Sequence, residues 1–219
     1  MNKIVIEFLT QLQLNNNRDW FLKNKKMYEE SKKEVESFVN SIIPAIAKYD
    51  PAMKYIEAKD CMFRIFRDVR FSKDKSPYKT NMGAWMTKVG RKSPGPGYYL
   101  HIQPGESFLA GGVYMPEPDQ LKRIRQEIYY NTAEFKALLA DKKFGRYFKG
   151  ISEMDKQKLA PRDFPKDFPD IDLLKHKHYT VDHPVTDKQL TEEGFMVYVV
   201  NVFEALQPLN RFLNRALES

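Results

Sequence analysis

The first fifty residues carry hydrophobic side chains at helical spacing. Apolar residues recur every three or four positions up to Leu12, and the run 15–17 then supplies three asparagines, which favour turns and helix caps. The same spacing continues from residue 18 to about residue 49, with Lys and Glu on the opposite face. The pattern predicts a short helix, followed by one long helix or two joined helices. Pro44 kinks or interrupts this helical stretch, and Asp50-Pro51 ends it.

The middle of the chain changes to the shorter period of strands. Four short segments are rich in aromatic and other β-compatible residues, and Ser-Pro and Pro-Gly turn formers separate them. They predict an antiparallel meander of about four to five strands. The Gly111-Gly112 pair in the last segment predicts a bulge or a close approach of two backbones. The four segments are 61–66, 82–87, 98–103 and 107–115.

Helical spacing returns in the second half, with one irregular interruption. A helix is predicted after Pro118, and Thr132 is predicted to cap the next one. Residues 141–183 repeat Phe-Pro and cannot sit in a continuous helix, although a strand is expected at 178–182. The last helix is predicted over 187–217. No repeat or flexible linker separates the halves, so we expect a single α+β domain over 1–219, with the meander packed against N-terminal and C-terminal helices.

Composition narrows the class of protein. The chain has 219 residues, of which 42% are hydrophobic, which is ample for a buried core. It has no apolar run of eighteen residues and no signal-peptide pattern, so we expect a cytoplasmic protein with no membrane partner. The single cysteine, Cys61, excludes an internal disulfide and a thiolate zinc cage. Its place beside apolar residues predicts a small buried hydrophobe.

The positive charge is confined to one stretch. Residues 61–92 carry nine basic and two acidic side chains, a net charge of +7 that equals the formal charge of the whole chain. The remainder is therefore neutral, which favours a local anion-facing surface over a generally basic protein. The side chains concerned are Arg64, Arg67, Arg70, Lys73, Lys75, Lys79, Lys88, Arg91 and Lys92, with Asp68 and Asp74.

Within this stretch, the segment RDVRFSKDKSPYKT at 67–80 is the candidate binding site. Ammonium, guanidinium and hydroxyl groups surround a Ser-Pro turn, and such groups can enclose a phosphate or carboxylate. The alternative is a solvated hairpin loop whose arginines pair with acidic helices. The expected ligand-binding residues are Arg64, Arg67, Arg70, Lys73, Lys75, Ser76, Tyr78 and Lys79.

His101 is the candidate catalytic residue. Strand alternation places its ring on the face opposite Leu100 and Ile102, where it could act as a general base oriented by Asp68 or Asp74. The alternative is a hydrogen-bonded sheet histidine.

The other histidines do not predict a metal centre. His176 and His178 would share a face in a strand, but they lie in the lysine-rich stretch KHKHYT, which would repel a divalent cation. No metal site is expected, and the sequence assigns no cofactor.

These observations leave three classes of function open. The leading expectation is a protein that binds a phosphate-bearing or carboxylate ligand at 67–79, which includes an enzyme acting on a small anionic substrate. The second is a nucleic-acid-binding module that uses the same cations, with neighbouring aromatic rings for stacking. The third is a non-enzymatic protein that docks on an acidic partner.

Three blocks of the sequence resemble a known family. The blocks NNNRDWFLKNKKMYEE, RIFRDVRFSKDKSPYKTNMGAWM and YYLHIQPGESFLAGGVYMPEP are similar in order and spacing to the bacterial domain of unknown function 2461. The similarity runs from residue 15 to about residue 128 and continues less distinctly to the C-terminus. The resemblance implies a conserved hypothetical bacterial protein and carries no activity or residue role. The matching positions include 67, 68, 70–79, His101, Gly111 and Gly112.

Overall fold

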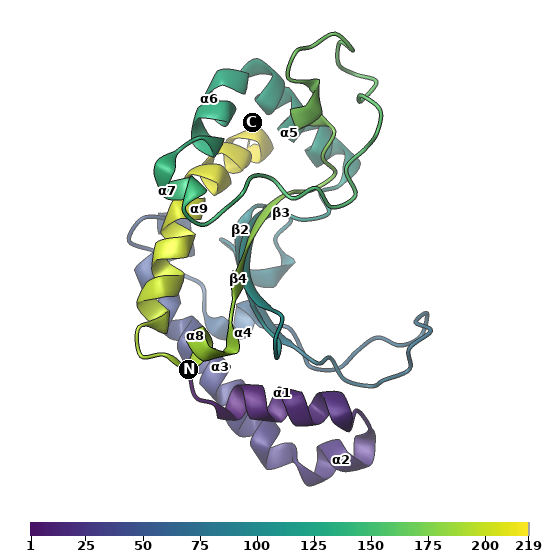
Figure 1. Ribbon diagram of the computed structural model, residues 1–219, viewed down its shortest axis with the longest axis vertical. Coiled ribbons are helices and arrows are strands. Elements are labelled where there is room, and N and C mark those ends of the chain that lie inside the picture. Colours follow the sequence, from purple (N-terminus) through teal and green to yellow (C-terminus); the bar gives the residue numbers. More distant parts are fainter. Residues whose placement is uncertain (219) are drawn as a thin grey trace. The chain divides into compact units, whose positions relative to one another are not determined.

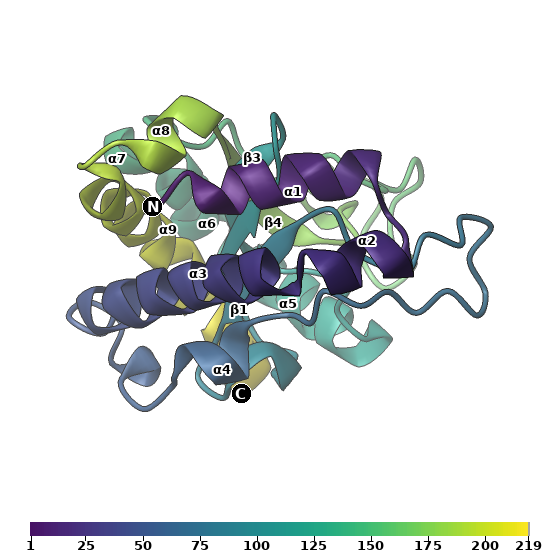
Figure 2. The same cartoon turned by 90° about the horizontal axis from the view of Figure 1, so that it is seen from below.

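The computed structural model describes residues 1–218 and has an α+β architecture, shown in two views in Figures 1 and 2. Four antiparallel strands form one sheet in the order β1-β2-β3-β4, so strands that follow one another in the chain are neighbours in the sheet. The predicted fold class and meander are confirmed. The strands are β1 (Met82–Met86), β2 (Gly97–Ile102), β3 (Ser107–Val113) and β4 (Tyr179–Val185).

The chain forms two compact units, and each unit is assembled from separate segments. The first contains Met1–Ser93, Tyr99–Leu109 and Pro184–Asn201. The second contains Pro94–Tyr98, Ala110–His183 and the described residues from Val202 onward. The last helix and three of the four strands contribute residues to both units.

The N-terminal helices of the first unit follow the predicted pattern. They are α1 (Ile4–Leu14), α2 (Arg18–Lys23) and α3 (Lys25–Ile46), so the second helical stretch is two joined helices. The Asn17 side chain caps α2 by accepting a hydrogen bond from the Trp20 backbone N–H at 3.0 Å. Pro44 lies inside the last turn of α3, and a 3₁₀ turn, η1 (Pro51–Met53), follows.

The predicted strand at 61–66 is wrong. Cys61 ends a short helix, α4 (Ala58–Cys61), and residues 62–66 make only two isolated bridges, from Met62 to Ala84 and from Phe66 to Tyr78. The two bridges are in different registers, because four positions separate Met62 from Phe66 but six separate Tyr78 from Ala84, so one regular ladder cannot include both. On the tip side, the Pro77 carbonyl accepts from the Arg67 N–H at 3.0 Å, but proline has no N–H with which to return a bond, so regular pairing also stops there.

The second unit contains the helices after β3. They are α5 (Pro118–Tyr130), α6 (Thr132–Leu139) and α7 (Lys142–Gly145), with a 3₁₀ turn, η3 (Ile171–Leu174), before β4. The prediction that Thr132 caps α6 is wrong. Its hydroxyl donates to the Ile128 carbonyl oxygen at 2.7 Å, a bond back to the preceding helix, and Asn131 occupies the cap position.

The C-terminal helix expected over 187–217 is interrupted. The chain forms α8 (Asp187–Thr191) and then α9 (Phe195–Glu218). The helix α8 ends at Thr191 because the backbone of the next residue, Glu192, is extended (φ −70°, ψ 146°). Pro208 lies inside α9. No helix within residues 1–218 is long and apolar enough to cross a membrane.

Gly112 confirms the close backbone approach expected in β3. Its φ is +100°, and a Cβ atom there would lie 2.0 Å from the Tyr179 carbonyl oxygen on β4. Asn210 of α9 supports the same point, because its side chain accepts from the Gly112 N–H at 3.1 Å and donates to the Gly97 carbonyl at 3.0 Å. Only glycine fits this position without strain.

Candidate functional site

Residues 64–79 form a hairpin that we call the basic hairpin, and its tip (67–76) projects away from the sheet in both overall views (Figures 1 and 2). Its base is anchored by Tyr78, which is 5% exposed and stacks on Phe21 of α2 with ring centroids 3.9 Å apart. Asn16 holds the same residue by two hydrogen bonds, of 2.9 and 3.1 Å, to its backbone. The structure therefore places Tyr78, an expected ligand residue, in the packing that supports the hairpin.

The carboxylate of Asp74 is paired within the tip. It accepts hydrogen bonds from the Ser76 hydroxyl at 2.6 Å and from the Ser76 N–H at 2.9 Å, and it forms an ion pair with Arg67. These bonds, those from Ser76 first and then that from Arg67, hold the pKa of Asp74 far below its usual range. Asp74 is therefore an ionised group that orders the loop.

Asp68 is paired in the same way. Its two carboxylate oxygens accept from Nε and Nη2 of Arg70 at 2.9 and 2.7 Å, and this pairing lowers the pKa of Asp68. Within residues 1–218, neither Asp68 nor Asp74 contacts His101. The structure brings each acid to a neighbouring arginine and brings neither acid to the histidine.

Three cations of the basic hairpin form no ion pair with a carboxylate among the described residues, although the Arg64 charge acts on Asp68 at longer range. Arg64 and Lys73 are exposed, and Lys75 donates to the Val69 carbonyl at 3.0 Å while its charge stays uncompensated. Net positive charge therefore remains on the hairpin after its internal ion pairs have formed.

Lys79 connects the hairpin to the sheet. Its Nζ atom lies 5.3 Å from the centroid of the Phe63 ring, in a cation–π arrangement. Burial, and second the neighbouring Arg64 charge, lower the pKa of Lys79. Its ammonium group is less fully solvated than a free surface lysine and sits beside an aromatic ring.

The sheet has one closely packed face and one open face. Ala84, Leu100 and Ile102 point to the packed face and are at most 1% exposed. Their neighbours Trp85 and Tyr99 point to the opposite face and are only half-buried. We call this second surface the outer face. In Figure 1, α3 and the projecting tip lie on opposite sides of the sheet. The outer face carries Phe63, Asn81, Trp85, Tyr99, His101, Gln103 and Phe108.

Tyr99 lies at the centre of an aromatic group on the outer face. Its ring centroid is 6.3 Å from that of Phe63, 6.2 Å from that of Trp85 and 5.7 Å from that of Phe108. The ring can lie close to β1 because residue 83 is glycine, where a Cβ atom would meet the Tyr99 hydroxyl oxygen at 2.7 Å. Burial raises the pKa of Tyr99 to about 12, so its hydroxyl stays a donor.

His101 is buried and fully hydrogen-bonded on the same face. Its Nδ1 lies 3.0 Å from the Tyr99 hydroxyl, its Nε2 lies 3.2 Å from Oε1 of Gln103, and the Asn81 amide is within 3.3 Å of both. A neutral imidazole protonated at Nε2 satisfies Tyr99 and Gln103, because Nδ1 then accepts and Nε2 donates, and the Asn81 amide nitrogen, itself a donor, can hydrogen-bond only to Nδ1. The ring also stacks on Phe108 at 4.5 Å. Burial lowers the pKa of His101, against smaller opposing effects of Gln103 and Glu106.

The structure thus divides the residues expected at the site. Lys79 and His101 share the outer face, connected through Phe63 and Tyr99. Arg67, Arg70, Lys73, Lys75 and Ser76 lie at the projecting tip with the two acids. Sequence reasoning missed Asn81, Gln103 and Phe108. Strand parity is the signal that could have found Gln103, since it shares the parity of Tyr99 and His101.

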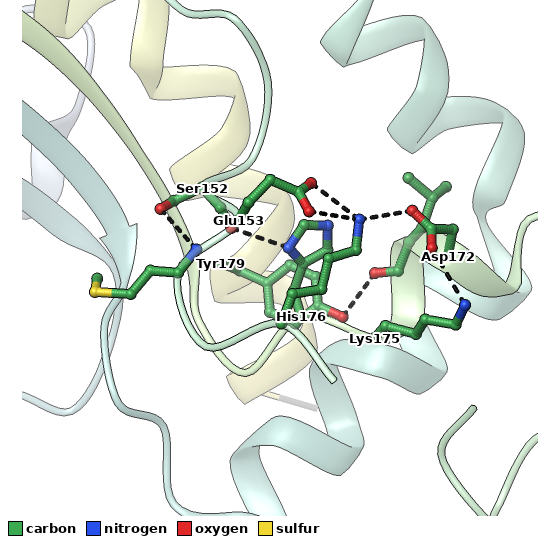
Figure 3. A network of polar contacts seen from close by, with 9 residues as sticks. Ser152, Glu153, Asp172, Lys175, His176 and Tyr179 are labelled. Carbon is green, nitrogen blue, oxygen red and sulfur yellow. Dashed lines mark hydrogen bonds and ion pairs between the residues drawn. The ribbon is translucent and has the colours of Figure 1, made fainter. Parts of the chain in front are cut away.

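The remaining histidines belong to the second unit, where they make structural contacts. Nδ1 of His176 lies 3.0 Å from the Ser152 carbonyl oxygen, next to the ion pairs of Asp172 (Figure 3). Burial, as the main cause, lowers the pKa of His176. His178 accepts from the Met115 N–H at 3.0 Å. No group of three or more His, Cys, Asp or Glu side chains within residues 1–218 is placed to hold a metal ion.

Cys61 is fully buried, as the sequence predicted. Burial first, and the adjacent Asp60 second, raise the pKa of Cys61 to about 11. The side chain is therefore a thiol at neutral pH, and the thiolate that a nucleophile requires is disfavoured.

Comparison with known proteins identifies the family. The model of a conserved hypothetical protein family, DUF2461, matches residues 4–212, and the chain belongs to this family. The family's function is unknown. Neither the curated proteins nor the solved structures contain a match.

Proposed function

We propose that this member of the DUF2461 family binds a phosphate-bearing ligand through the basic hairpin and the adjoining edge of the outer face. The observation that carries the proposal is the set of hairpin cations that form no ion pair, on a projecting hairpin within the one stretch, residues 61–92, that accounts for the net charge of the chain. Phosphate oxygens are the complementary acceptors for ammonium and guanidinium groups. A cytoplasmic location in bacteria is part of the same proposal.

The distribution of the cations favours a ligand with several anionic groups. Arg64 and Lys79 lie at the base of the hairpin, whereas Lys73 and Lys75 lie at its tip. Charges spread along a hairpin contact successive phosphates better than they enclose a single small anion. A carboxylate ligand with one charge would use only part of this surface.

We propose ligand binding and assign no catalytic role to His101. A general base needs a proton acceptor that a substrate can reach, but both ring nitrogens of His101 are engaged by neighbouring side chains and the residue is only 9% exposed. Its hydrogen bonds support a structural role, in which the ring fixes the rotamers of Tyr99 and Asn81 beneath a ligand.

Inorganic polyphosphate tests the proposal, because it offers phosphates and no other recognition group. The double variant Lys73→Glu/Lys75→Glu is expected to bind it at least about tenfold more weakly than the unchanged chain, since charge-assisted hydrogen bonds contribute about 1.5–3 kcal/mol each. Isothermal titration calorimetry at fixed salt measures the difference.

The matched control is Lys25→Glu/Lys26→Glu. It makes the same change of charge at exposed positions of α3, outside the hairpin. Equal loss of affinity in both double variants would show that only net charge matters. Such a result, or no binding of polyphosphate by the unchanged chain, would overturn the proposed function.

A further inference from the structure

We infer that the phosphate-bearing ligand is a single-stranded nucleic acid, whose bases stack on aromatic rings beside the basic hairpin. This inference rests on the proposed function, because the same cations hold the phosphates. It adds a second kind of contact, made by side chains that phosphate binding alone does not use.

The first observation is that three phenylalanine side chains in or next to the basic hairpin are exposed. Phe63, Phe66 and Phe71 are 41%, 49% and 95% exposed. Exposure of an apolar ring to water is unfavourable, and several exposed aromatic side chains in one segment are typical of binding surfaces. Arg70 lies 5.8 Å from the Phe71 ring centroid, so cation and ring are presented together at the tip.

The second observation is the continuity of rings and cations toward the sheet. Lys79 lies over Phe63, Phe63 meets Tyr99 edge-on, and Tyr99 meets Trp85 edge-on. Trp85 and Tyr99 are half-buried, so parts of both side chains remain accessible. Aromatic side chains beside a positively charged track form the usual surface for single strands, where each stacked base contributes about 1–3 kcal/mol.

The chemistry of the surface separates single strands from the other anionic ligands. Polyphosphate and acidic peptides satisfy the cations but leave the exposed rings in water. Duplex nucleic acid satisfies the cations, but its bases are already stacked on one another. A single strand offers phosphates and free base faces together, so it is the class that satisfies both parts of the surface.

The fluorescence of Trp85 can report base stacking directly. The chain has two tryptophans, so the variant Trp20→Phe leaves Trp85 as the only one. The probe is an oligothymidylate of about twelve nucleotides, within the span bound by one single-strand-binding domain. We expect it to bind and to quench Trp85 fluorescence. Polyphosphate is expected to compete for the hairpin without quenching.

A ring substitution tests the stacking contact itself. Phe63→Leu keeps an apolar side chain of similar size and removes the π face, so affinity for oligothymidylate should fall about tenfold while affinity for polyphosphate stays unchanged. Tyr55→Leu is the matched control, because Tyr55 is an aromatic residue of the same unit that is 85% exposed and lies outside the hairpin. An unchanged thermal midpoint shows that both variants fold.

The outcomes separate this inference from the proposed function. If polyphosphate binds in a hairpin-dependent manner but oligothymidylate causes no quenching, or if Phe63→Leu binds the oligonucleotide normally, stacking is overturned and phosphate binding stands. If a duplex of the same length binds as tightly as the single strand, the preference for free bases is overturned. If neither polyphosphate nor oligothymidylate binds, both ideas fail.

Discussion

His101 shows how a residue with catalytic chemistry can be held in a structural role. Tyr99 and Gln103 engage its two nitrogens, and Phe108 covers one side of the ring. Protonation would turn Nδ1 from an acceptor into a donor that faces the Tyr99 hydroxyl, which must then rotate to accept. Burial adds the cost of desolvating the charge, and both effects favour the neutral imidazole.

The lowered pKa of His101 predicts an acid-sensitive fold. A histidine whose pKa is lower in the folded than in the unfolded chain binds fewer protons when folded. Its stabilising effect is complete above the unfolded value of about 6.5 and is lost as the pH falls from there toward the folded pKa. We expect the free energy of unfolding, from urea denaturation, to decrease between pH 7.5 and pH 5.5.

The variant His101→Gln isolates this contribution. Glutamine keeps hydrogen-bonding capacity and does not titrate, so the decrease in stability over the same pH range should be smaller than in the unchanged chain. His176, whose pKa is also lowered, leaves a residual slope. An identical pH dependence in the variant would show that His101 does not contribute.

At the scale of elements, the basic hairpin is ordered by its own polar groups. The pairs Asp74–Arg67 and Asp68–Arg70 lie entirely within the tip, and Lys75 donates back to the Val69 carbonyl. These contacts order the loop, and they leave the charges of Arg67 and Arg70 neutralised by Asp74 and Asp68. The charge available to a ligand is therefore smaller than the sequence count suggests and falls mainly on Arg64 and three lysines, Lys73, Lys75 and Lys79.

The close approach of β3 to β4 depends on Gly112. Gly112→Ala is expected to lower the free energy of unfolding by about 2 kcal/mol or more, since its φ of +100° alone costs an L-residue about 1–3 kcal/mol and the added Cβ meets the Tyr179 carbonyl. Gly145→Ala is the control, because nothing lies within 4 Å of a Cβ there and the residue is helical. Urea denaturation should show the control unchanged or slightly more stable. Equal stability of Gly112→Ala would contradict the claim that only glycine fits this position without strain.

The elements that sequence predicted best are those with strong local signals. Alternation placed β1, β2 and β3 within about two residues of their observed ends, and it gave the face of His101 correctly. The strand predicted at 61–66 was wrong because the register of pairing changes between the Met62–Ala84 and Phe66–Tyr78 bridges, and the local pattern of these residues carries no signal for that change. The hydrogen-bond partners of His101 were harder to predict than the strands. The contact with Asn81 depends on the register between β1 and β2, and a single sequence does not specify that register.

At the scale of the whole molecule, the formal charge is concentrated in one segment of the chain. The entire formal excess of +7 lies in residues 61–92, which include the basic hairpin and β1. The neutral remainder supplies helices and strands that hold this segment without adding to its field. Association driven by so local a charge should depend on ionic strength, because salt screens exposed charges over about 10 Å at 0.1 M.

The dependence of affinity on salt tests the central claim most directly. Four cations that contact four phosphates of a single strand should give a log–log slope of about −3, since each contact contributes about −0.7. The four are Arg64, Lys73, Lys75 and Lys79. We expect this slope for oligothymidylate with the unchanged chain, and a slope of about −1.5 or shallower with Lys73→Glu/Lys75→Glu. A slope near zero, or the same slope in both proteins, would contradict phosphate binding by the basic hairpin.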